Sequence, residues 1–318
     1  MDLQKMMKNR KTEFVSLIMV IGLVVFMSIF NSRFVGAKNL QGLLMDMANL
    51  MIISAGIMFV LMIGSIDLSA GAIASFSAVI TATMVQSASG GGLVIALLFG
   101  AAAGLINGLL VIYLHIPSFI ATLATMSVWS SMALVMSGSA SVAVPKKYAG
   151  VLVPFKWTAG VLSTPILIGI GIVIVSFILL SMTKFGKYSY AIGANETAAR
   201  MCGAPVKRTK LISFTICGLF SSLLGILLVA KIKSASPYVG DDFDMLGIAA
   251  AAMGGISLSG GRGHGLWMVT GCAIIAIVQN GIAVIGVPAY AQKVVYGVII
   301  MLAIIITADR KSKLTVIK

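Results

Sequence analysis

Long apolar segments separated by short polar ones run through nearly the whole of this 318-residue chain. Hydrophobic residues make up 59% of the sequence and charged residues only 10%, and the mean hydropathy is +1.07. A soluble globular domain carries about a quarter charged residues, so this chain has too little polar surface to cover itself in water. The expected fold class is therefore an all-α polytopic protein, with the lipid bilayer as its surroundings and the cell membrane as its location.

A membrane-spanning helix needs roughly 20 apolar residues, and ten segments approach that length. They are 14–30, 43–63, 68–86, 93–114, 118–137, 165–182, 211–230, 245–261, 266–286 and 289–307. No small-residue cleavage site of the A-x-A kind follows the first segment, so it is expected to remain as a span and not to be removed as a signal peptide. Residues 1–318 are expected to form a single transmembrane domain.

The basic residues predict the orientation, because cytoplasmic loops carry an excess of lysine and arginine. With both termini inside, fifteen of the 23 basic residues are cytoplasmic, Lys293 falls within a span, and seven are outside. Those seven are Arg33, Lys38, Lys146, Lys147, Lys156, Lys231 and Lys233. The census favours cytoplasmic termini, with residues 138–164 and 231–244 outside. Topology thus explains the net charge of +14, and no nucleic-acid partner is expected.

Two features of the spans concern packing and symmetry. Gly100, Gly104 and Gly108 are spaced by four residues, which places them on one helix face where a neighbouring backbone can approach closely. The segments "NGLLVIYLHIP" (107–117) and "NGIAVIGVP" (280–288) share their first residues and a closing proline. They end the fourth and ninth predicted spans, an odd offset that would invert the second copy. The sequence therefore suggests an inverted repeat, as in many transporters.

The segment "GSIDLSAG" (64–71) places Asp67 between two apolar spans, where an uncompensated charge is costly. Two interpretations fit the residues. Asp67 or Ser69 would cap the following helix or form a hinge, or they would belong to the translocation path. Asn107 and Asn280, the polar residues of the repeated segments, join them as path or hinge candidates.

The longest predicted cytoplasmic segment, 183–210, contains signals for one short helix. Asn195 suits the N-cap, and Glu196 suits the positive end of the helix and pairs in the favourable order with Arg200 four residues later. Gly203 suits the left-handed position after the helix, and the proline two residues later prevents continuation. A helix of two turns is marginal in water, so we expect the helix, from about Glu196 to Cys202, to be held by a protein partner.

Within that segment, "GANETAARMCG" (193–203) resembles the E-A-A-x-x-x-G coupling loop of ABC importer permeases. Together with "GSIDLSAG", "PSFIATLATM", "FGKYSYAIGANETAAR" and "IAAAAMGGISLSGGRG", it resembles the ribose/galactose/xylose-type branch of that family. The motifs occur in the family's order over most of residues 50 to 300. The resemblance implies a ten-span permease that pairs with a second copy or a paralogue, two cytoplasmic ATPase subunits, and an extracytoplasmic sugar-binding protein.

The same resemblance implies which residues couple the permease to the ATPase. They are Gly193, Asn195, Glu196, Ala198, Ala199, Arg200 and Gly203. One departure concerns the segment before "IAA", where the family commonly has E-L-D-A and this chain has "DMLG". Asp244 keeps the first acid, but Leu246 replaces the second, which leaves the identity of the sugar open.

The chain itself is expected to be a transport component and not an enzyme. It contains no G-x-x-x-x-G-K-[ST] phosphate loop, and its three scattered cysteines give no metal-type spacing, so no cofactor or metal is expected. The alternative functions are an ion-coupled secondary transporter of a small polar solute and a channel or passive pore. The outer lysines at 146, 147, 231 and 233 are exceptions to the inside bias, so Lys146, Lys147, Lys231 and Lys233 are candidates for docking the binding protein or are simply solvated.

Overall fold

The computed structural model of the chain describes residues 11–88, 90–159, 162–288, 291–292, 294–298 and 301. The longer helices are α2 (Lys11–Phe30), α3 (Ala37–Met62), α4 (Ala70–Ala88), α5 (Gly91–Tyr113), α6 (Ser118–Ser137), α7 (Thr164–Met182), α10 (Val206–Ile232) and α12 (Met268–Ile285). The shorter ones are α8 (Lys184–Ala194), α9 (Glu196–Met201), α11 (Phe243–Met253) and the 3-10 helices η1 (Ser32–Val35), η2 (Lys146–Lys156) and η3 (Gly265–Trp267).

Two small antiparallel ladders lie in the loops. Strand β1 (Val142–Ala143) pairs with β4 (Ser234–Ala235), with Val142 opposite Ala235. Strand β2 (Thr158–Ala159) pairs with β3 (Leu162–Ser163), with Thr158 opposite Ser163. These two-residue strands are the only departure from the predicted all-α architecture within the described residues.

The helices confirm a multi-pass membrane protein. Among the described residues, six helices are long and apolar enough to cross a bilayer: α3, α5, α6, α7, α10 and Gly265–Ile285. Three shorter apolar helices accompany them: Val15–Phe30, Ala70–Gln86 and Phe243–Met253. The tenth predicted span, 289–307, lies mostly outside the described residues.

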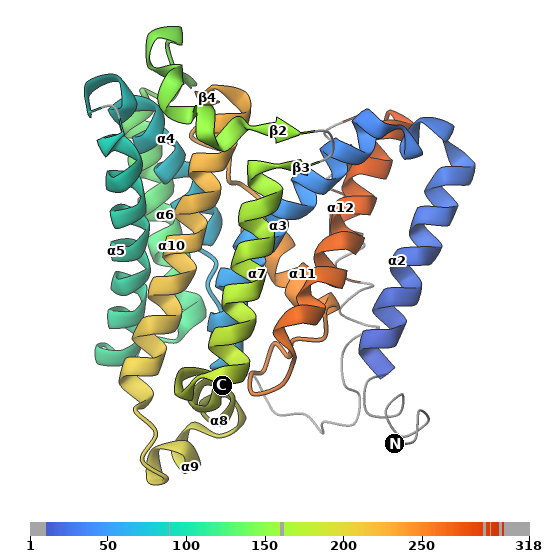
Figure 1. Cartoon of the computed structure of the whole chain (residues 1–318). Helices are drawn as coiled ribbons and strands as arrows, with labels where there is room; N and C mark the ends of the chain where they lie inside the picture. The colour runs from blue at the N-terminus through green and yellow to red at the C-terminus, as the bar shows by residue number, and fades with distance from the viewer. Residues whose placement is uncertain are drawn as a thin grey trace.

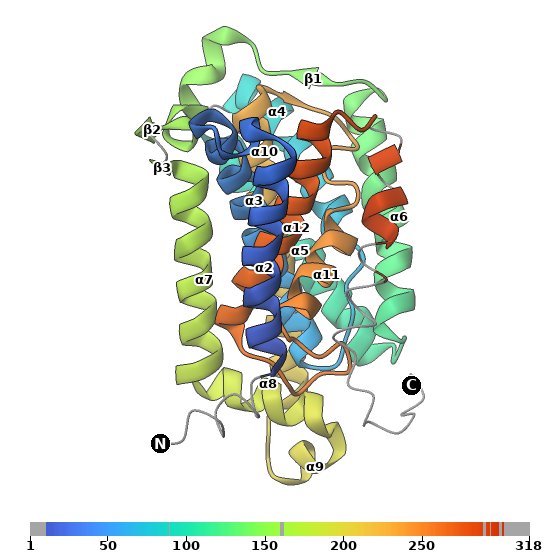
Figure 2. The same ribbon diagram turned by 90° about the vertical axis from the view of Figure 1, so that its right-hand side faces the viewer.

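The segments that connect the long helices lie at the two ends of the helix bundle. Helices α8 and α9 and the start of α2 lie at one end, the lower one in Figures 1 and 2. The two ladders and η2 lie at the opposite end. The segments predicted to be outside therefore lie at the far end of the bundle from the segment predicted to be cytoplasmic.

The eighth predicted span is wrong as a full-length helix. The sequence predicted 245–261, but α11 ends at Met253 and an irregular turn follows as far as His264. The physical reason is glycine: Gly255, Gly260, Gly261 and Gly263 all have positive φ, between 68° and 130°. Such backbone cannot continue a right-handed helix, although the segment is apolar enough to resemble a span.

Helix α3 lies at the centre of the bundle. Every residue from Ala48 to Met62 is buried, and α3 packs against α7, α10, α11 and α12. The outer helices instead leave apolar side chains exposed, among them Ile29 on α2, Leu98 on α5 and Val135 on α6. In lipid such surfaces need no polar cover, so the pattern fits a bundle surrounded by a bilayer.

The glycine stripe packs as predicted. On α5, a Cβ at Gly100 would meet the Gly218 carbonyl oxygen of α10 at 2.5 Å, and a Cβ at Gly104 would overlap the Phe214 carbonyl. Gly108 continues the same contact against Leu211. Only glycine lets the two backbones approach so closely.

Candidate functional site

The predicted short helix is present as α9 at one tip of the molecule (Figures 1 and 2). Asn195 is extended, with φ −162°, and its side-chain oxygen accepts a hydrogen bond from the Ala198 amide at 3.0 Å. The helix runs from Glu196 to Met201, with Cys202 as its C-cap and Gly203 at φ +81°. The Ala204 amide reaches back to the Ala199 carbonyl at 3.0 Å, the bond of a left-handed glycine cap. The predicted capped helix is thus confirmed.

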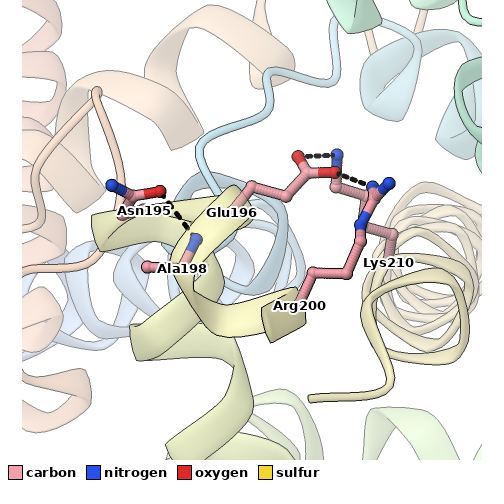
Figure 3. A network of polar contacts seen from close by, with 5 residues as sticks. All are labelled: Asn195, Glu196, Ala198, Arg200 and Lys210. Atoms are coloured by element: carbon pink, nitrogen blue, oxygen red, sulfur yellow. Dashed lines mark hydrogen bonds and ion pairs between the residues drawn. The ribbon is translucent and has the colours of Figure 1, made fainter. Parts of the chain in front are cut away.

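Glu196 ties α9 to the start of α10. Its carboxylate accepts a bond from Arg200 at 2.9 Å, the predicted pair, and another from Lys210 at 2.6 Å (Figure 3). Partial burial acts to raise the pKa of Glu196, but the hydrogen bond from Lys210 and the charges of Lys210 and Arg200 hold it below its ordinary value. The carboxylate therefore stays ionised and bridges two helices. Sequence reasoning placed Lys210 only as a cytoplasmic charge and missed this contact.

The rest of α9 presents a free surface. Ala199 is buried against the chain, whereas Ala198, Arg200 and Gly203 are exposed. Met201 is exposed as well, at 84%. An apolar side chain held out at the tip of the molecule beside a capped glycine turn is suited to enter a groove on another protein.

Helix α8 was not predicted, and it positions α9. Thr183 caps it by accepting the Gly186 amide at 3.3 Å, and the single residue Asn195 separates it from α9. Gly193 lies in its last turn, where a Cβ would overlap the Met62 carbonyl oxygen and the Gly261 nitrogen. Among the residues that the resemblance assigned to coupling, Gly193 therefore faces the chain's own interior.

Three of the four path or hinge candidates form one buried network. Asp67, Ser69 and Asn107 are each 0% exposed. The Ser69 hydroxyl donates to Asp67 Oδ1 at 2.7 Å and accepts from Asn107 Nδ2 at 2.7 Å. Thr125 of α6 completes the chain by donating to Asn107 Oδ1 at 2.7 Å. The network joins the α3–α4 connection to α5 and α6.

Side chains of α6 also accept hydrogen bonds from the backbone of the α3–α4 connection. The Ile66 amide donates to Ser118 Oγ at 3.1 Å, and the Leu68 amide donates to Thr122 Oγ1 at 3.2 Å. Irregular backbone at membrane depth needs such partners, because lipid offers none. Asp67 and Ser69 thus belong to a polar support for a break between two helices, and a role in the translocation path stays a prediction.

Asn280 does not join this network. It lies on α12 and exchanges two hydrogen bonds with Asn39 of α3, at 2.8 and 3.1 Å. The symmetric amide pair holds α12 against α3. Asn107 and Asn280 therefore bond to different elements, despite their matching sequence context.

The four docking candidates lie at the end of the bundle opposite α9. Lys146 and Lys147 are exposed at the start of η2, and Lys147 lies 5.6 Å from the centre of the Tyr148 ring. Lys233 is the exposed left-handed C-cap of α10, with φ +61°. Lys231 pairs with Asp46 at 2.9 Å, so it is less available to a partner than the others. Across the described part of the chain, no group of three or more His, Cys, Asp or Glu residues is placed to hold a metal ion.

Comparison with known proteins gives a consistent result. Residues 39–304 match the family described as a permease component of branched-chain amino acid transport systems. The chain is 37% identical to the ribose import permease protein RbsC of Bacillus subtilis, over 91% of this chain and 90% of that protein. It is 32% identical to the L-arabinose transport system permease protein AraH of Escherichia coli, over 92% and 90%. It is also 32% identical to the L-arabinose ABC transporter permease protein AraH of Azospirillum brasilense, over 93% and 88%. No solved structure matches the chain.

Proposed function

The chain belongs to this family of transport-system permease components, and we propose that it forms the membrane pathway of an ABC importer for a monosaccharide. It is a multi-pass protein of the cell membrane and a transport component, not an enzyme. In this proposal separate ATPase subunits hydrolyse ATP, and an extracytoplasmic binding protein delivers the sugar.

The observation that carries the proposal is the geometry of α9. The helix is capped at both ends, tied to α10 through Glu196 and Lys210, and exposed at Met201. A bond network of this kind fixes the helix relative to the span that follows it. A displacement of α9 by an ATPase groove would therefore be passed directly to α10, because the ion pair joins the two helices and no flexible loop has to transmit the movement.

The sugar class rests on the relatives. The relatives described above are named as permeases for ribose or L-arabinose, and each aligns with more than 90% of this chain. The family description names branched-chain amino acids, a chemically distant cargo. We favour a pentose-type monosaccharide because the full-length relatives agree on it.

Topology and assembly complete the proposal. We propose that α8, α9 and both termini are cytoplasmic. In this proposal the chain crosses the membrane ten times and contains an inverted repeat. A second copy or a paralogue would form the other half of the pathway.

Lys146 and Lys147 would steer the binding protein through complementary charge, so reversing both charges should slow its association and flatten the salt dependence. An unchanged on-rate would remove these lysines from the docking surface.

The test is reconstitution of the chain with its ATPase and binding protein in proteoliposomes. ATP supplied on the ATPase side should drive uptake of ribose or arabinose without any ion gradient, and excess leucine should not compete. Uptake that requires a proton or sodium gradient and ignores ATP would instead show a secondary transporter. Competition by leucine would show that the family description, and not the relatives, names the cargo.

A further inference from the structure

Three segments that are distant in sequence meet at four glycines, which we call the glycine joint: Gly64, Gly193, Gly260 and Gly261. Gly64 directly follows the residue that caps α3, Gly193 lies in the last turn of α8, and Gly260 and Gly261 lie in the turn after α11. A Cβ at Gly260 would meet the Gly64 nitrogen at 2.6 Å and the Gly193 Cα at 3.0 Å. The three backbones therefore touch without any side chain between them.

Backbone conformation independently requires glycine at three of these positions. Gly64, Gly260 and Gly261 have φ values of +73°, +87° and +68°, which L side chains rarely adopt. Gly193 lies in a helix and is excluded from carrying a side chain by contact alone, because its Cβ would overlap Met62 and Gly261. The Gly261 amide also donates to the Met62 carbonyl at 3.0 Å, which links two of the segments directly.

A second contact fastens α8 to the same turn. The Tyr190 hydroxyl donates to the Gly263 carbonyl at 2.8 Å. Tyr190 and Gly193 are three residues apart, so they lie on one face of α8. That face of α8 therefore contacts the turn between α11 and α12 at two points.

The two helices that precede the joint along the chain, α3 and α11, end in the same way. After α3, the Gly64 and Ser65 amides bond to the Leu61 and Val60 carbonyls at 2.9 and 3.1 Å. After α11, the Gly255 and Ile256 amides bond to the Ala252 and Ala251 carbonyls at the same distances. Both helices therefore stop at a left-handed glycine cap. Beyond them lie the buried Asp67 network on one side and the α11–α12 turn on the other.

We propose that the glycine joint carries displacement of α9 into both helix breaks, with Gly193 as the positioning residue. The inference rests on the proposed function, in which α9 docks on an ATPase. Helices α8 and α9 are separated by one residue, so movement of α9 shifts Gly193. Because the neighbouring backbones are in direct contact, the shift passes to the end of α3 and to the turn after α11 without being absorbed by side-chain rotation. The joint thus makes opening of the pathway depend on the ATPase.

The test compares Gly193→Ala with Gly171→Ala in the complete complex of permease, ATPase and binding protein. Gly171 is a helical glycine of α7 with nothing within 4 Å of its added Cβ, so this control changes helix propensity alone. Both variants should retain the ATPase on purification and hydrolyse ATP. Gly193→Ala should lower the sugar taken up per ATP hydrolysed by about tenfold, within the range that couplings between two sites usually span. An unchanged ratio would overturn the proposal, and so would a parallel fall in hydrolysis and uptake.

A gentler variant keeps the proposal testable if Gly193→Ala does not fold. Tyr190→Phe removes only the hydrogen bond to Gly263 and keeps the ring, and it should lower the same ratio about two- to fivefold, as one contact of a shared coupling. If Tyr190→Phe takes up as much sugar per ATP hydrolysed as the wild type, the proposal is overturned. Failure of the proposed function looks different, because the wild-type complex itself would lack ATP-dependent uptake or lose its ATPase.

Discussion

Gly203 follows the C-cap of α9 in the left-handed conformation. Substitutions there distinguish a conformational effect on the end of the helix from a steric effect at the surface of the partner. The φ of Gly203 is +81°, and a Cβ added there would meet nothing within 4 Å. The cost of Gly203→Val within the chain is therefore conformational and not steric. A left-handed residue costs roughly 1–2 kcal/mol for an L side chain, with a β-branched one at the upper end. That corresponds to about a 5- to 30-fold shift of the helix away from its capped form.

Gly203→Asn is the matched control. Asparagine tolerates the left-handed conformation yet adds a side chain of similar size to valine. Binding of the ATPase to the purified permease should weaken for the valine variant, by up to about 30-fold, if only the capped form of α9 is competent to bind. It should change little for the asparagine variant. Wild-type affinity for Gly203→Val would refute the need for the capped turn, and equal losses in both variants would show that bulk at the partner's surface is what matters.

Three further outcomes are expected. Lys210→Met should weaken ATPase binding about two- to fivefold, because the Glu196 pair is partly exposed and worth about 0.5–1 kcal/mol, and the loss should vanish in a background that already carries Glu196→Gln. Asn107→Leu should lower the free energy of unfolding in detergent by about 2–4 kcal/mol, since it breaks two buried hydrogen bonds, and an unchanged melting temperature would contradict the network. Membrane-impermeant thiol reagents applied outside should label Lys147→Cys and spare Lys187→Cys, and the opposite pattern would invert the topology.

Local signals made α9 predictable. The cap, the ion pair, the left-handed glycine and the following proline all lie between Asn195 and Pro205. Each acts through bonds within a few residues, so none depends on the rest of the fold. The long spans were predictable for a similar reason, because hydropathy reports directly on lipid burial.

Contacts across the bundle were not predictable in the same way. Asn280 bonds to a residue 241 positions away, and Lys210 reaches Glu196 across 14 positions. No pattern within one segment contains that information. The same holds for Lys231, whose partner Asp46 lies 185 residues away.

The end of α11 was missed because hydropathy and backbone conformation disagree there. The residues after Met253 remain apolar and glycine-rich, which resembles a span. Positive φ at Gly255 nevertheless ends the helix. Further along the turn, Gly260 also has positive φ and makes close contact with Gly64 and Gly193, so glycine is needed there as well. Helix α8 was missed because two glycines within eleven residues weaken its helical signal.

The seating of α9 on an ATPase can be measured on the native chain. Cys202 is the C-cap of α9 and is exposed, whereas Cys217 and Cys272 are buried. A thiol-specific photocrosslinker added to the permease in the membrane, before the ATPase subunits are supplied to assemble the complex, should therefore attach at Cys202. Illumination should yield a covalent adduct between the permease and the ATPase subunit. The absence of that adduct, or an adduct formed only with the external binding protein, would contradict the account.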